Sequence, residues 1–100
     1  MKTIWKFPLE VTDLQKISVP KDSTILTVQA QREVPCLWVL VDAEKESEER
    51  FIRIVKEERS IRIAGTGHPI LEKLSRYIGT FQLREGSFIG HVFEVEGGGV

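Results

Sequence analysis

The segment Thr24–Asp42, TILTVQAQ-REVP-CLWVLVD, decides the fold. Two runs rich in β-branched and apolar residues, 24–31 and 36–42, flank the four-residue break Arg32–Pro35. Two such runs around a short break are typical of a β-hairpin. We therefore expect an antiparallel pair of strands here and build the remaining assignments outward from it.

The second run is apolar on both of its alternating faces. Leu37, Val39 and Val41 fall on one face, and Cys36, Trp38 and Leu40 fall on the other. A strand that is apolar on both faces is typical of the interior of a sheet. The sequence therefore predicts a central strand between two buried layers.

Shorter strands are predicted before this hairpin. Residues 4–8 alternate, with Ile4 and Lys6 on one side and Trp5 and Phe7 on the other. Pro8 closes the run, and proline lacks the N–H that a central ladder needs, so the run is expected to be an edge strand. Leu14–Val19 is expected to form a second short strand that Pro20 ends.

Charged and turn-forming residues divide the second half of the chain. Residues 43–49 carry four glutamates and are expected to form a solvated, mobile loop. A second hairpin is predicted from 51–55 and 60–64, with Arg53 and Arg62 pointing outward. The loop Gly65–Pro69 follows.

The C-terminal third is predicted to hold a helix and a hairpin. Apolar residues at three- and four-residue spacing predict a short helix over 70–77. Runs 79–83 and 88–95 flank a turn in which Gly86 supplies the positive φ. The fold class is thus mainly β (α+β), a compact antiparallel sheet or small sandwich of about seven strands with one short helix. Residues 1–96 form the single domain, and 97–100 a flexible tail.

Composition excludes several classes of function. The 100 residues include 14 Lys and Arg against 15 Asp and Glu, so the net charge is 14 − 15 = −1. A nucleic-acid polymer is therefore a disfavoured partner. The single Cys36 fits a reducing cytoplasm. The longest apolar run, Cys36–Val41, is too short to span a membrane, and no signal peptide is apparent.

Catalytic and metal-binding patterns are sparse. Cys36, His68 and His91 contain no close pair of zinc ligands, so no metal and no cofactor are predicted. Cys36 lies in an apolar run and is read as a buried small hydrophobe rather than a nucleophile. Glu94 and Glu96 share a strand face, which could suggest paired carboxylates, but solvent-side positions alternating with Val95 are the preferred interpretation. No catalytic residue is assigned.

The strongest candidate site is the loop Gly65–His68. Backbone amides of Gly65, Thr66 and Gly67 could hold an anion, with His68 and Arg62 as further donors. A tight turn in which His68 is only a cap is the alternative. Trp38 or Phe81 could stack on a nucleobase, although in so small a chain aromatic residues are needed mainly for the core.

Four blocks of sequence together carry a resemblance. Pro35–Asp42 (PCLWVLVD), Gly65–Ile70 (GTGHPI), Tyr77–Gln82 (YIGTFQ) and His91–Glu94 (HVFE) occur in this order. The chain resembles an uncharacterised family of small bacteriophage-encoded proteins with this pattern. The resemblance implies an accessory protein acting in the cytoplasm of an infected bacterium, with an anti-defence role.

Two modes of action from different classes fit that resemblance. The leading hypothesis is a non-enzymatic homo-oligomer that sequesters a host nucleotide second messenger at the Gly65–His68 loop, because pockets between subunits can enclose a ligand. The alternative is an inhibitor that docks a host defence protein through a strand edge or an apolar patch. An enzyme that cleaves a nucleotide with His68 or His91 as base, and a component of the virion, also remain open.

Overall fold

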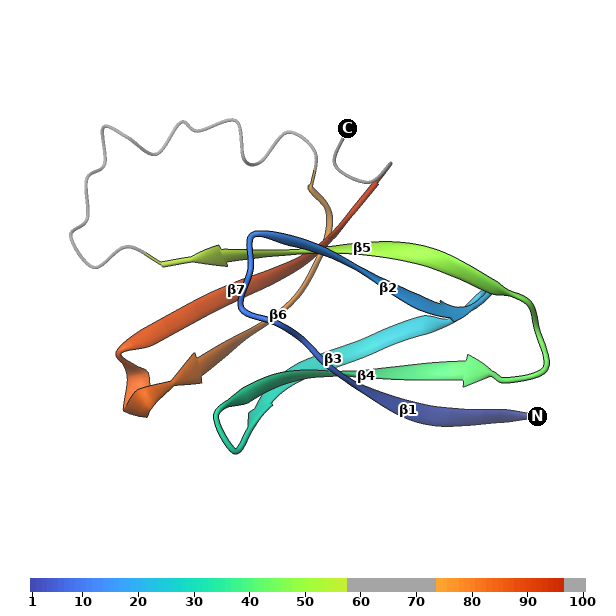
Figure 1. Cartoon of the computed structure of the whole chain (residues 1–100), viewed down its shortest axis with the longest axis horizontal. Helices are drawn as coiled ribbons and strands as arrows, with labels where there is room; N and C mark the ends of the chain where they lie inside the picture. Colours follow the sequence, from blue (N-terminus) through green and yellow to red (C-terminus); the bar gives the residue numbers. More distant parts are fainter. Residues whose placement is uncertain (58–73, 97–100) are drawn as a thin grey trace.

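The computed structural model describes residues 1–57 and 74–96, and this part of the chain is almost entirely β-strand (Figure 1). The strands are β1 (Lys2–Pro8), β2 (Leu14–Pro20), β3 (Thr24–Gln31), β4 (Val34–Asp42), β5 (Ser47–Lys56), β6 (Leu74–Leu83) and β7 (Phe88–Val95). A single 3-10 turn, η3 (Arg84–Gly86), joins β6 to β7. The predicted mainly β fold of seven strands is confirmed.

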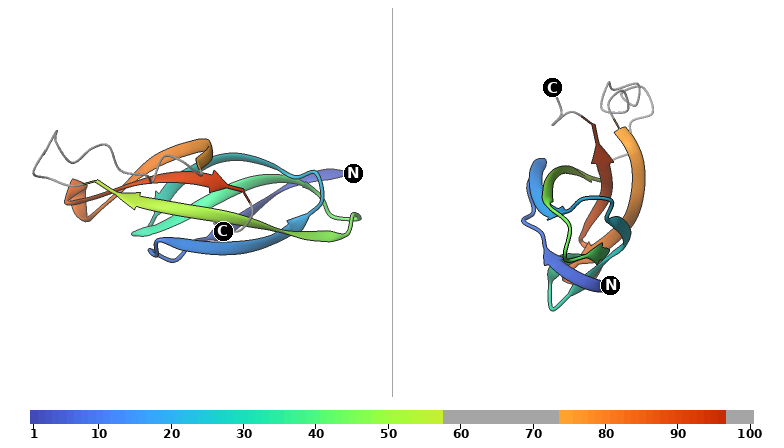
Figure 2. Two further views of the ribbon diagram at one scale, coloured as in Figure 1. Left: turned by 90° about the horizontal axis from the view of Figure 1, so that it is seen from above. Right: turned by 90° about the vertical axis from the view of Figure 1, so that its right-hand side faces the viewer.

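The strands form two antiparallel sheets that pack as a sandwich. One sheet has the order β1-β4-β3 and the other β2-β5-β7-β6. The left view of Figure 2 looks onto the stacked sheets and shows β6, β7, β5 and β2 side by side in this order. β4 lies between β1 and β3, so its predicted central position is confirmed, as is the edge position of β1. Residues 1–57 and 74–96 contain no membrane-spanning helix.

The core lies between the facing sides of the two sheets. Each sheet contributes alternate apolar residues that are fully buried, among them Val19, Leu37, Val39, Val41, Ile52 and Val92. Along one side of the sandwich, the edge strand β3 lies against the edge strand β6 of the other sheet. There the Arg76 guanidinium donates to the carbonyl oxygen of Ile25 at 3.1 Å. A Cβ on Gly79 would lie 2.9 Å from Cγ1 of Val28, so this glycine permits the close approach.

The β3–β4 turn is shorter than its sequence indicates. Only Arg32 and Glu33 form it, with φ of 53° and 67°, because Val34 and Pro35 already pair with Gln31 and Ala30. Two consecutive positive φ values match the twist of a two-residue hairpin. The hairpin is confirmed, with a two-residue turn in place of the expected four-residue break.

The predicted helix over 70–77 is wrong for its second half. Leu74 to Tyr77 belong to β6, where Arg76 pairs with Glu94 and Tyr77 with Phe93. The Tyr77 ring also packs edge-on against the Phe93 ring at 5.5 Å. About two turns of helix are marginal without tertiary support, and pairing with β7 overrides the helical spacing. Residues 70–73 lie outside the described part of the chain.

The first arm of the predicted hairpin between 51–55 and 60–64 lies within β5. β5 begins earlier, at Ser47, so the predicted loop over 43–49 is too long. Over 51–53 its two edges are taken by β2 and β7, which leaves no edge there for a hairpin partner. Residues 60–64 lie outside the described residues.

The C-terminal hairpin of β6 and β7 is confirmed. Its turn contains Gly86 at φ 95°, the left-handed region that the sequence predicts for this glycine. The Gly65–Pro69 loop and the 97–100 tail fall outside the described residues and stay predictions.

Candidate functional site

Most of the predicted ligand-binding residues lie outside the described part of the chain. These are Arg62, Gly65, Thr66, Gly67 and His68. Phe81 is described, but its side chain is 3% exposed in the core and its ring stacks on Phe88. It is therefore not open to a nucleobase, and this role is wrong for Phe81. Trp38 alternates with the core residues Leu37 and Val39 and is not part of the core cluster that contains Phe81, so the structure does not bring the two rings together.

Trp38 belongs instead to an apolar surface on the outer side of the three-stranded sheet. Ile4 lies directly opposite Leu40, and Lys6 opposite Trp38. We call the four side chains Ile4, Val34, Trp38 and Leu40 the outer apolar face. Ile4 is 54% and Val34 40% exposed, and Trp38 and Leu40 are half-buried. The expected second buried layer over β4 is thus wrong for Trp38 and Leu40.

Cys36, on the same side of β4, is an exception. Its thiol is free and its side chain is 3% exposed, so its predicted burial is confirmed. Beside it, the Lys6 ammonium donates to Gln31 Oε1 at 2.5 Å, which links the two edge strands β1 and β3 across β4. The aliphatic stem of a lysine covers apolar surface while its charge stays in water. This end of the sheet is therefore closed by a polar bridge, whereas Ile4 and Leu40 are left open.

β1 also exposes the polar groups of its backbone. β4 is its only neighbour in the described sheets. The Leu9 N–H donates to the Pro35 carbonyl oxygen at 2.8 Å. In an antiparallel ladder every second residue turns both its N–H and its C=O toward the partner strand. Counting back from Leu9, these residues are Thr3, Trp5 and Phe7. The N–H groups of Lys2, Ile4 and Lys6 consequently point to the open edge.

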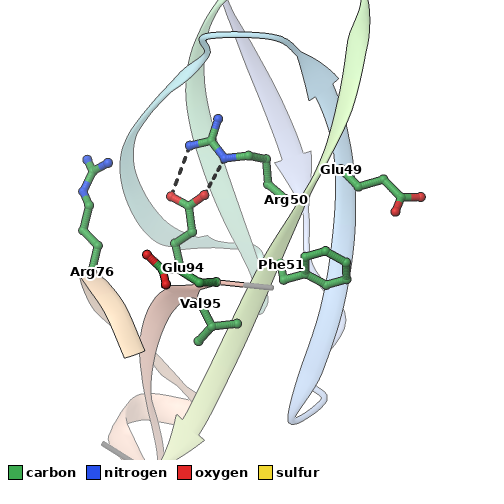
Figure 3. Close-up of a pocket in the computed structure, with 7 residues that line it drawn as sticks. Glu49, Arg50, Phe51, Arg76, Glu94 and Val95 are labelled. Carbon is green, nitrogen blue, oxygen red and sulfur yellow. Dashed lines mark hydrogen bonds and ion pairs between the residues drawn. The ribbon is translucent and has the colours of Figure 1, made fainter. Parts of the chain in front are cut away.

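A second candidate site is a hollow of about 580 Å³ at one end of the four-stranded sheet. It is lined by Glu49, Arg50, Phe51, Arg76, Glu94, Val95 and Glu96. Figure 3 shows Arg50 and Glu94 pointing toward one another, whereas Glu49 and Phe51 leave β5 on the other side. With Glu49 turned away, Arg50 and Arg76 are matched by Glu94 and Glu96, so the hollow has no excess of positive charge to hold an anion.

The charged groups of Arg50 and Glu94 are engaged with one another and with the backbone. The Arg50 guanidinium binds both carboxylate oxygens of Glu94, and it also donates to the Ser23 carbonyl oxygen at 3.0 Å. Each side chain of the pair is 16% exposed. Hydrogen bonding to Glu94 raises the pKa of Arg50 above its ordinary value. Glu94 is thus a structural ion-pair partner, and the solvent-side position predicted for it is wrong.

His91 sits in a chain of hydrogen bonds on the outer side of the four-stranded sheet. Its Nε2 lies 2.8 Å from Glu57 Oε1, and its Nδ1 lies 2.9 Å from Thr80 Oγ1. Thr80 Oγ1 in turn lies 2.5 Å from the Tyr77 hydroxyl. Both ring nitrogens are therefore engaged within the protein. No group of three or more metal-ligating side chains occurs among the residues that the structure describes.

Sequence reasoning singled out Trp38 but not Ile4, Val34 or Leu40 as surface residues. One signal was present: Ile4 stands between Lys2 and Lys6 on the polar side of an alternating edge strand. A large apolar residue between two lysines is out of place on a solvated face. The open edge of β1 was indicated by Pro8.

The comparisons with known proteins give a family and no activity. No curated protein matches the chain, and no solved structure matches it. One family model matches residues 1–99, nearly the full length, and its description is "Domain of unknown function (DUF7352)". The chain therefore belongs to the DUF7352 family.

Proposed function

We propose that this chain is a non-enzymatic binding protein that docks a partner protein on its outer apolar face. The observation that carries the proposal is the cross-strand pair Ile4 and Leu40 with the neighbouring Trp38, an apolar surface that no other layer of the described structure covers. Contiguous exposed apolar surface on a small domain marks an interaction site more often than chance.

The composition of this face fits a protein partner better than a small ligand. Trp side chains are enriched among the residues that dominate binding energy at protein interfaces. The face is an extended sheet surface with charged residues beside it, Lys2 and Asp42, which corresponds to an apolar centre with a polar rim.

The resemblance to small bacteriophage-encoded proteins supplies the kind of partner. In that setting the partner is a protein of the bacterial host, and the chain acts in the host cytoplasm as an inhibitor of a defence protein. Capture of a signalling nucleotide at Arg62 and the Gly65–His68 loop stays a separate prediction, because those residues lie outside the described structure. Titration calorimetry with a panel of cyclic and linear nucleotides, beside Thr66→Ala, tests it independently.

The docking proposal is tested by affinity capture from bacterial lysate with three forms of the protein. The wild type is compared with the double variant Trp38→Thr/Leu40→Thr and with Val11→Thr. Val11 is 48% exposed away from the face and serves as the matched control. A stoichiometric partner retained by wild type and Val11→Thr but lost by the double variant supports the proposal. A partner retained equally by all three forms refutes it.

A further inference from the structure

We infer that an extended strand of the partner pairs with the open edge of β1. The residues of that partner strand on the outer face of the sheet are an acidic, an apolar and an acidic residue in this order. This inference rests on the proposed function, and it specifies the mode of docking and the chemistry of the partner. An extended segment that pairs with an exposed sheet edge gains main-chain hydrogen bonds, while alternate side chains give specificity.

The backbone geometry of β1 sets which residues would meet that strand. The Leu9 to Pro35 hydrogen bond fixes the phase of the ladder, so Lys2, Ile4 and Lys6 present both N–H and C=O to the open side. Pro8, in the same phase, contributes only its carbonyl. Three donors and four acceptors therefore stand along one edge, sufficient for a short added strand.

The side chains of those same residues all lie on the outer face of the sheet. Ile4 neighbours Leu40, and Lys6 neighbours Trp38. A strand paired with β1 would place its directly opposed residues on this face as well. An apolar residue opposite Ile4 would extend the outer apolar face by one strand, which joins the edge and the face into one surface.

The charges of β1 select the flanking residues of the partner. Lys2 and Lys6 form no ion pair with any residue that the structure describes, and both are exposed. The Lys6 ammonium would exchange its hydrogen bond to the neutral Gln31 side chain for one to a carboxylate of the partner. Opposite charges directly across two strands stabilise the pairing, and like charges destabilise it. Carboxylates opposite Lys2 and Lys6 therefore fit. The pattern Lys-x-Ile-x-Lys is symmetric, so parallel and antiparallel strands both satisfy it.

A second copy of this chain fits the edge less well. Antiparallel self-pairing centred on Ile4 has a large overlap, and it places Lys2 opposite Lys6 of the second copy at two positions. In each of these two pairs the like charges of the lysines repel one another. We therefore expect the predicted homo-oligomer to use another surface.

The test uses two synthetic peptides of seven residues with capped ends, mostly threonine with valine at the fourth position. One carries glutamate at the second and sixth positions and the other carries lysine there. Binding to the full chain is followed by shifts of the backbone amide resonances in 15N-labelled protein. We expect the glutamate peptide to bind at least about tenfold more tightly than the lysine peptide. The amide shifts should be centred on Lys2, Ile4 and Lys6.

Two variants make the result specific. In Lys2→Glu/Lys6→Glu the preference should reverse, so that the lysine peptide binds more tightly. Ile4→Pro removes an N–H that points away from β4, so the fold should persist while peptide binding is lost. Circular dichroism confirms that each variant is folded.

Several outcomes overturn the inference. These are equal binding of the two peptides, no reversal in the charge-swapped variant, amide shifts confined to other strands, or concentration-dependent shifts of the Ile4 amide without peptide, which indicate a second copy on this edge. If one of these outcomes is observed while Trp38→Thr/Leu40→Thr still fails to capture the partner, the docking proposal is supported and strand addition at β1 is refuted. If that variant also retains the partner, the proposed function falls as well.

Discussion

Gly90→Ala should destabilise the domain through a single added methyl group. A Cβ at this position would lie 2.6 Å from Cζ and 2.7 Å from Cε1 of Phe81, and 3.1 Å from Cγ2 of Ile54. Carbon atoms in a packed core prefer roughly 3.5 to 4.0 Å. The Phe81 ring has little room to retreat, because it is 3% exposed and stacks on Phe88 at 6.0 Å between ring centroids.

The expected cost follows from overpacking a core. Inserting a methyl group into a well-packed interior costs typically about 1 to 3 kcal/mol, and we take about 2 kcal/mol here. For a domain of this size, each 1 kcal/mol lowers Tm by roughly 4 to 8 °C. Gly90→Ala should therefore lower Tm by roughly 8 to 16 °C. Differential scanning calorimetry at one protein concentration measures this shift.

The double variant Gly90→Ala/Phe81→Leu isolates the steric cause. A leucine lacks the ring edge that the new methyl meets, so the double variant should be more stable than the sum of the single effects by at least about 0.5 kcal/mol. Ser18→Ala, an exposed strand position, is the control and should change stability by less than about 0.5 kcal/mol. A Tm for Gly90→Ala within 2 °C of wild type, or strictly additive single effects, would refute the reasoning.

Three further expectations follow from the described contacts. Arg50→Met leaves the Glu94 carboxylate, 16% exposed, without its guanidinium partner. Urea unfolding should show that the free energy of unfolding falls by about 2 kcal/mol, and Arg50→Met/Glu94→Leu should largely recover it. A loss no smaller in the double variant contradicts the role of the pair. Hydrogen bonding to Lys45 holds the pKa of Asp22 below its ordinary 3.8, so its contribution to stability is present above the unfolded-state pKa and lost as pH falls through the lower folded-state pKa. In carbon-detected NMR titrations Lys45→Met should return that midpoint toward 3.8, and an unchanged midpoint excludes Lys45 as the cause. Trp38→Thr should lower the binding of a hydrophobic fluorescent dye to the folded protein, and an undiminished signal places the dye elsewhere.

The first half of the fold could be predicted because its signals are local. β1 to β4 follow from alternation, from prolines that end the strands and from an apolar run. The C-terminal hairpin of β6 and β7 could be predicted for the same reason. Residues 51–55 and 74–77 could not, since their strand partners are not found in the sequence nearby. The region around Phe51 reads as one arm of a local hairpin, yet its actual neighbours lie in β2 and β7. Likewise, helical spacing before Tyr77 yields to pairing with β7, a tertiary effect that no short window of sequence contains.

The site could be predicted only in part for a related reason. Trp38 and Phe81 carry the same chemical signal in the sequence, an aromatic residue inside a strand. Which of the two meets solvent depends on the sheet face each one occupies and on whether a second layer covers that face. The structure covers Phe81 and leaves Trp38 half-buried. Composition cannot decide between these outcomes, because each residue lies in a run that is expected to be a strand with at least one buried face.

The joint between β3 and β6 has a mechanical consequence. The two layers are fastened along that side by the Arg76 to Ile25 hydrogen bond and the close approach of Gly79 to Val28, while β1 and β2 end the opposite side as strands with one neighbour each. The two sheets are therefore held together more firmly at the β3–β6 side than at the β1–β2 side. Local unfolding should therefore begin at β1 and β2, and their amide hydrogens should exchange with solvent before those of β3 and β6.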